Sequence, residues 1–268
     1  MAVMCAFVAT PVLADYYGGQ VYWERIDVPK YYSGNGGEFT LRSDGGLGLL
    51  LSNSAYAETT RDQGGYDKSF QTFCIERTEY VRQPMGIMVS TSWTPNSDGS
   101  SSQIPQWGAD PLEPASHAIL GGMAFGDDLN PQTAYLYTQF ATGVLSSYDY
   151  TGDDRDESAG YLQSAIWFLE GEIGTVAGQA ATWIQEGVDA ANLAYGGFNP
   201  NSTSSFFNTW GATIGAVRVL NMYGLNSDGS INYSDRKQDQ LYLTPVPGAV
   251  LLGMIGLGLV SLKLRRFA

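Results

Sequence analysis

The sequence predicts an α+β fold in which an antiparallel β-sheet or barrel carries a central helical insert, followed by a C-terminal hydrophobic helix. Aromatic and β-branched residues alternate between glycine-rich turns in the first third of the chain, a pattern typical of strands. In the centre the apolar spacing takes the period of a helix, and near the end the alternation returns. We therefore expect a β-rich part over residues 15–93, a helical part over 130–192 and a β return over 216–243.

Turn signals divide the β parts into individual strands. Strands are expected at residues 19–23, 38–42, 70–81, 216–223 and 240–243. A long loop rich in Ser, Asn and Pro is expected over residues 95–114, and an Asn-Ser-Asp-Gly turn at 226–229 separates the last two strands.

Three helices are expected in the central part. Asn130 followed by Pro131 predicts the start of the first, because proline is favoured at the first helical position. The acidic run at residues 153–157 favours the start of the second, since negative charge stabilises a helix N-terminus, and Gly171 follows its end. The third is expected over residues 177–191.

The chain is strongly acidic. Among its 268 residues, 27 are Asp or Glu and 14 are Lys or Arg, which gives a net charge of -13. Such a surface repels phosphate backbones, so nucleic acid is not an expected partner. The single histidine, His117, cannot form a histidine-clustered metal site, and no phosphate-binding loop or nucleophile elbow is present. We therefore predict no metal, no cofactor and no catalytic residue, and a protein that is not an enzyme.

The first 14 residues read as a signal peptide. They carry no charge, are largely apolar and end at Ala14 after small or short residues, as a signal peptidase requires. A buried first element is the alternative. Removal of this leader also removes Cys5, so the mature body, residues 15–243, keeps Cys74 as its one thiol.

The last residues have the order of a sorting tail. Pro245, Val246 and Pro247 precede an apolar run at residues 248–262, and a basic cluster of Lys263, Arg265 and Arg266 follows it. Basic residues stay on the cytoplasmic side, which places the body outside the cytoplasm. The alternative is a permanent anchor in the inner membrane.

This tail, residues 244–268, resembles the PEP-CTERM sorting signal of Gram-negative bacteria in its glutamate-free form, with Val246 where the family usually has glutamate. The resemblance implies an exported protein that enters the inner membrane through its C-terminal helix and is processed by an exosortase-type enzyme. It also implies delivery to the cell surface or the medium, often together with exopolysaccharide.

Two motifs of the body resemble the thioester domains of bacterial surface adhesins. Cys74 follows the aromatic Phe73, and Gln163 begins a Gln-Ser-Ala-Ile-Trp run that fits the adhesin motif. The resemblance implies that Cys74 is the thiol partner and Gln163 the acyl partner of an internal thioester that captures amines. Phe73, Trp167 and Phe168 are the candidates to shield this bond from water.

The alternative for Cys74 is a structural role, because a free cysteine is often a small buried hydrophobe. Both interpretations predict that the strand of Cys74 packs near the helix of Gln163. Three hypotheses for function follow: an exported, non-enzymatic surface or matrix protein, a covalent adhesin that uses the thioester, and a secreted hydrolase acting on polysaccharide.

Overall fold

A computed structural model of the chain describes eight segments, residues 16–24, 31–34, 36–43, 56–61, 69–77, 85–89, 129–195 and 216–243. The predicted leader at 1–14, the loop at 95–114, His117 and the tail at 244–268 lie outside these residues. None of the described helices is long and apolar enough to cross a membrane.

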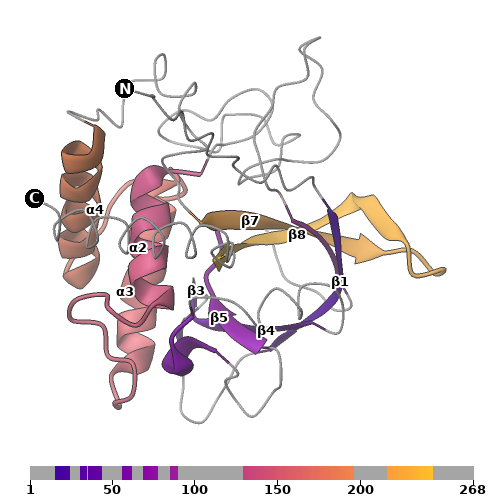
Figure 1. The fold of residues 1–268 in the computed structure, drawn as a ribbon, viewed down its shortest axis with the longest axis horizontal. Coiled ribbons are helices and arrows are strands. Elements are labelled where there is room, and N and C mark those ends of the chain that lie inside the picture. The colour runs from indigo at the N-terminus through magenta and orange to yellow at the C-terminus, as the bar shows by residue number, and fades with distance from the viewer. Residues whose placement is uncertain are drawn as a thin grey trace, which may run out of the picture.

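The described residues form a mixed α+β structure in which three helices pack on one side of a curved antiparallel sheet (Figure 1). The six strands of the sheet are β1 (Tyr16–Glu24), β4 (Phe39–Ser43), β5 (Ser69–Thr72), β6 (Met85–Val89), β7 (Val217–Leu225) and β8 (Ile231–Leu243). Their order is β5-β4-β1-β6-β7-β8, and every neighbouring pair is antiparallel. The α+β class predicted from the sequence is therefore confirmed.

The two edges of the sheet come together just after β5. The N–H of Leu241 on β8 donates to the carbonyl of Phe73 at 3.1 Å, and the N–H of Ile75 donates to the carbonyl of Asp239 at 3.1 Å. Within the described segments this contact does not amount to a closed barrel, because β5 has only four residues and Cys74 forms a single bridge with Gln240. Of the two expected arrangements, the described strands form the open sheet.

Outside the six strands, the described residues also form a small hairpin and a short 3-10 helix. The hairpin joins β2 (Tyr32–Ser33) and β3 (Gly36–Gly37), which pair with each other. The 3-10 helix, η1, covers Glu58–Thr60. The hairpin contacts α3, so it belongs to the helical side of the molecule.

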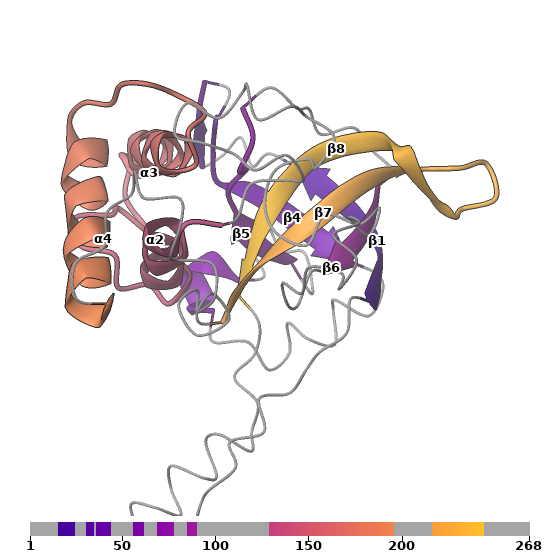
Figure 2. The ribbon, with the colours of Figure 1, turned by 90° about the horizontal axis from the view of Figure 1, so that it is seen from above.

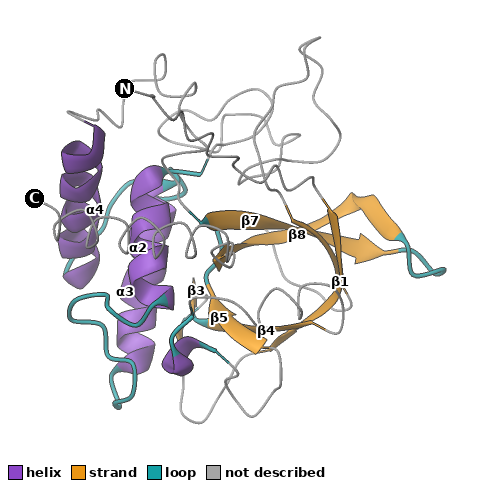
Figure 3. Ribbon diagram, viewed as in Figure 1, coloured by secondary structure: helices purple, strands orange, loops and turns teal. Residues whose placement is uncertain are grey.

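The helices are α2 (Pro131–Ala141), α3 (Arg155–Leu169) and α4 (Gln179–Tyr195), shown in purple in Figure 3. They confirm the three expected helical positions, although α4 begins two residues later and ends four residues later than the predicted 177–191. Asn130 precedes α2 as predicted, but its side chain does not cap the helix. The side-chain nitrogen Nδ2 of Asn130 donates instead to the carbonyl of Leu169, and this bond joins the start of α2 to the end of α3.

Two strand predictions need correction. The strand expected at 70–81 is regular only over β5, because Cys74 and its neighbours turn to meet β8, and residues 78–84 lie outside the description. The strand expected at 240–243 begins at Ile231. Its first part is polar and lacks an apolar stripe, and the backbone ladder with β7 holds it in place as a hairpin that projects from the body in Figure 2.

Aromatic side chains fill the space between the sheet and the helices. The Phe73 and Phe140 rings meet edge to face with centroids 4.9 Å apart, and Tyr56 lies 5.4 Å from Phe70. The hydroxyls of Tyr56 and Tyr137 are 2.7 Å apart, so these buried rings also satisfy each other's polar groups. Such burial favours folding by about 25 cal/mol per Å² of apolar surface.

Candidate functional site

Cys74 lies where the two edges of the sheet meet, and its backbone is fixed on both sides. The preceding carbonyl, of Phe73, and the following N–H, of Ile75, both bond to β8. The Cys74 side chain is 0% exposed. The thiol is therefore held by strand pairing rather than by a loop.

Gln163 is in the middle of α3, and its side chain faces Cys74. The Cys74 sulfur Sγ lies 3.3 Å from the Gln163 oxygen Oε1. The Cys74 N–H donates to the same Oε1 at 3.2 Å, and the Gln163 nitrogen Nε2 donates to the Cys74 carbonyl at 2.8 Å. Gln163 is 1% exposed, so water does not compete for these bonds. The predicted proximity of the two segments is thus present in the structure.

This arrangement places the Cys74 thiol against the oxygen of a carboxamide, to which it donates. The amide carbon Cδ is one bond of about 1.23 Å from Oε1, so it is adjacent to the atom that Sγ contacts. A backbone N–H aimed at the same oxygen can stabilise negative charge that develops there, as in an oxyanion hole. The pair therefore has the proximity, the burial and the donor that acyl transfer to sulfur needs.

The three predicted shielding residues have different surroundings. The edge of the Trp167 ring and the Gln163 side chain both lie against Gly36, where an added Cβ would be 3.1 Å from Trp167 Cη2. Phe73 is fully buried but packs on Phe140 of α2. Phe168 is partly buried and follows Gln163 by five residues, which on a helix turns it roughly 140° away.

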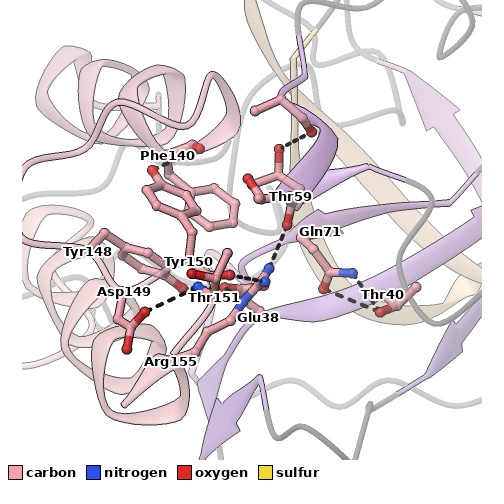
Figure 4. A network of polar contacts seen from close by, with 12 residues as sticks. Glu38, Thr40, Thr59, Gln71, Phe140, Tyr148, Asp149, Tyr150, Thr151 and Arg155 are labelled. Carbon is pink, nitrogen blue, oxygen red and sulfur yellow. Dashed lines mark hydrogen bonds and ion pairs between the residues drawn. The ribbon is translucent and has the colours of Figure 1, made fainter. Parts of the chain in front are cut away.

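A second buried polar cluster lies on the same helix, two turns before Gln163 (Figure 4). Arg155 Nε and Nη2 donate to the two oxygens of Glu38 at 2.9 and 2.8 Å, and the hydroxyl of Tyr148 donates to Glu38 as well. Arg155 also donates to the carbonyls of Thr59, at 2.7 Å, and of Tyr150. The guanidinium lies over the Tyr31 ring at 3.9 Å.

The electrostatics of this cluster are those of a buried ion pair. Burial raises the pKa of Glu38, and the guanidinium of Arg155 and the hydroxyl of Tyr148 oppose that rise. Burial lowers the pKa of Arg155, but attraction to the Glu38 carboxylate outweighs it, and the pKa is raised. The guanidinium therefore stays charged, and it joins the start of α3 to the residue that precedes β4.

Sequence reasoning did not identify this ion pair. The available signal was Arg155 itself, a single basic residue within the acidic run at the start of a helix. Nothing local in the run identifies the partner of Arg155, because Glu38 is distant in sequence. A cavity of about 400 Å³ adjoins the cluster and is lined in part by Tyr31, Glu58 and Thr151.

The described residues contain no group of three or more His, Cys, Asp or Glu side chains that could hold a metal ion. The sorting residues Pro245, Val246, Pro247, Lys263, Arg265 and Arg266, and the cleavage position Ala14, lie outside the description. Comparison of the chain with protein-family models, curated proteins and solved structures gives no match.

Proposed function

We propose that this chain is an exported surface protein that forms a thioester between Cys74 and Gln163 and uses it to capture an amine covalently. One observation carries the proposal: the Cys74 sulfur contacts the Gln163 carboxamide at 3.3 Å in a fully buried setting. The protein acts once per molecule, as a reactive binder rather than as a turnover enzyme.

Formation of the thioester needs no partner. Cys74 Sγ attacks Gln163 Cδ, and the charge that develops on Oε1 is stabilised by the Cys74 N–H that donates to it. The C=O bond then re-forms and the bond from Cδ to Nε2 breaks. Nε2 leaves as ammonia and carries the proton of the thiol, so atoms and charge balance.

Capture reverses the roles of sulfur and nitrogen. The nitrogen of an incoming amine attacks Cδ, the Cδ–Sγ bond breaks, and the sulfur leaves as a thiol with a proton from the amine. The product is an amide between Gln163 and the target. Burial protects the thioester from water until the target arrives.

The place of action is proposed from the two ends of the sequence. The apolar leader ending at Ala14 supports export, and the proline pair, apolar run and basic cluster of the tail support sorting at the inner membrane by an exosortase-type enzyme. Surface amines or material associated with exopolysaccharide are then the accessible targets.

Intact-mass spectrometry of the purified full-length protein tests the proposal. We expect wild-type protein to be lighter than its sequence by one ammonia, and methylamine to replace that deficit with one added methylene. Cys74→Ala and Gln163→Ala should show the full sequence mass and no response to methylamine. A wild-type mass equal to the sequence mass, unchanged by methylamine, would overturn the thioester.

A second function is favoured by the same contacts. The Gln163 amide and the Cys74 backbone exchange two hydrogen bonds, so the pair can join α3 to the sheet edge without reacting. In that case the chain is a non-covalent structural or adhesive surface protein. The mass measurement separates the two functions.

A further inference from the structure

We infer that the β2–β3 hairpin, described over residues 32–34 and 36–37, is the cover of the Cys74–Gln163 bond, and that Gly36 is a positioning residue that seats the Gln163 side chain. The inference rests on the proposed function. It adds the element that holds the acyl partner in place and that has to move before a target amine can reach it.

The first observation is that Gly36 has no room for a side chain. A Cβ at this position would lie 2.5 Å from Gln163 Cγ and 3.1 Å from Gln163 Cβ. The backbone of β3 therefore lies directly on the aliphatic part of the Gln163 side chain. Because Cβ atoms essentially never come within 3.0 Å of such a neighbour, glycine alone lets the hairpin sit this close.

The second observation is a matching contact one helical turn earlier. A Cβ at Gly160 would lie 2.8 Å from Ser33 Cβ and 3.2 Å from Ser33 Oγ. Gly160 precedes Gln163 by three residues, so both lie on the same face of α3. The two strands of the hairpin thus rest on one helix face at two glycine contacts.

The third observation is that few backbone hydrogen bonds hold the hairpin together. Each of its strands has two residues and pairs with the other, and Ser33 and Gly34 at its tip are exposed. On its other sides the reactive pair is enclosed by β8 and by α3 itself. Segments with few backbone bonds open at low free-energy cost.

The base of the hairpin is anchored more strongly than its tip. Glu38 follows β3 directly and is fixed by Arg155. The N–H of Glu38 also donates to the carbonyl of Tyr31 at 2.8 Å, which closes the hairpin at its base. Movement of the tip about this base would uncover Gln163 and leave the rest of the fold in place.

Gly160→Ala tests the cover from the end that does not touch Gln163. The added methyl group collides with Ser33 and lifts the hairpin, while alanine remains a good helix former. We expect the thioester still to form, and methylamine to be captured roughly tenfold faster, the factor for about 1.4 kcal/mol of weakened closure. Adding Ser33→Gly removes the colliding atoms and should restore the wild-type rate.

Gly36→Ala tests the positioning role. Its methyl group displaces the Gln163 side chain, so the fraction of molecules lacking one ammonia should fall roughly tenfold if seating is weakened by about 1.4 kcal/mol. Gly34→Asn is the matched control in the same hairpin. Gly34 has φ +62°, which asparagine tolerates, and a Cβ there meets nothing within 4 Å, so the ammonia deficit should be unchanged.

Failure of this inference is distinguishable from failure of the proposed function. If wild-type protein shows the ammonia deficit but Gly160→Ala captures methylamine at the wild-type rate, the cover is wrong and the thioester stands. Alkylation of Cys74 by iodoacetamide in a Gln163→Ala background gives a readout that needs no thioester. Gly160→Ala should speed this alkylation, and an unchanged rate would also overturn the inference.

Discussion

At the scale of single residues, the buried glutamines Gln163 and Gln132 differ in their hydrogen bonding. Both are buried glutamines on helices, at 1% and 0% exposure. The amide of Gln163 is bonded on both sides to Cys74, whereas neither amide atom of Gln132 has a hydrogen-bond partner within the described part of the chain. Their different surroundings predict opposite responses to the same substitution.

We expect Gln163→Leu to lower the free energy of unfolding by about 1–3 kcal/mol, because it leaves the buried N–H of Cys74 without its acceptor. Gln132→Leu, the matched control, should be neutral or stabilising, since it removes an unsatisfied amide of similar size. Urea unfolding of both variants in a Cys74→Ala background separates this effect from the thioester. An equal loss of unfolding free energy in the two variants would contradict a stabilising role for the hydrogen bonds between Gln163 and Cys74.

The carboxyl of Asp149 gives a pH-dependent prediction. The N–H groups of Gly152 and Thr151 hold the pKa of Asp149 below its ordinary 3.8. A carboxyl with a lowered folded pKa adds stability above its unfolded pKa and loses it as pH falls through the folded value. Asp149→Asn should therefore be less stable than wild type near neutral pH and equally stable below the folded pKa. Urea midpoints at the two conditions measure this, and a pH-independent difference would refute it.

At the scale of elements, α3 connects the parts of the site. Gly160, Gln163 and Trp167 follow one another at spacings of three and four residues, which keeps them on one face of the helix, and Arg155 lies two turns before Gln163. Arg155 contacts the Glu38 carboxylate, and the shared face contacts the β2 strand, Cys74 and the β3 strand. The helix therefore sets the distances between the reactive pair, its cover and the anchor of that cover.

The contact between the start of α3 and the start of β4 depends on the buried ion pair of Arg155 and Glu38. We expect Arg155→Met to cost about 3–5 kcal/mol of unfolding free energy, because it leaves the Glu38 carboxylate buried without its countercharge. The double variant Glu38→Leu with Arg155→Met should lose less than Arg155→Met alone. Chemical unfolding of the two single variants and the double variant measures the coupling, and additive losses would mean that the pair is not coupled.

At the scale of the whole molecule, the site lies at the seam between the sheet and the helices. Cys74 belongs to the edge where β5 meets β8, and Gln163 belongs to the helical side, 89 residues later. A covalent bond here would close a long loop of the unfolded chain. A cross-link of that length stabilises a fold by roughly 4–5 kcal/mol in the chain-entropy description.

Methylamine should therefore destabilise the protein as a whole. We expect the Tm of thioester-containing protein to fall after methylamine treatment, because the amide product no longer joins the two layers. Cys74→Ala should have the lower Tm from the start and should not respond to the amine. Differential scanning calorimetry before and after treatment checks this, and an unchanged wild-type Tm would show that the link adds no constraint.

The sequence predicts local features of this fold better than it predicts contacts between distant residues. Pro131, the acidic run and Gly171 place the helices because the fixed φ of proline and the helix dipole act within one or two turns, although the Asn130 side chain does not cap α2. The first half of β8 was missed, since residues 231–239 carry no alternating apolar face and are held by pairing with β7. The motifs around Cys74 and Gln163 predicted that their segments would meet, and the structure brings them together.

The sequence by itself determined the α+β class, the positions of the three helices and the two residues of the candidate site, because periodicity, caps and motifs are local properties of the chain. Only the tertiary structure decided that Glu38 pairs with Arg155, that the sheet edges meet at Cys74 and that the β2–β3 hairpin lies on Gln163. These contacts join residues far apart in the chain. They depend on how the layers pack, and no local pattern of amino acids encodes that packing.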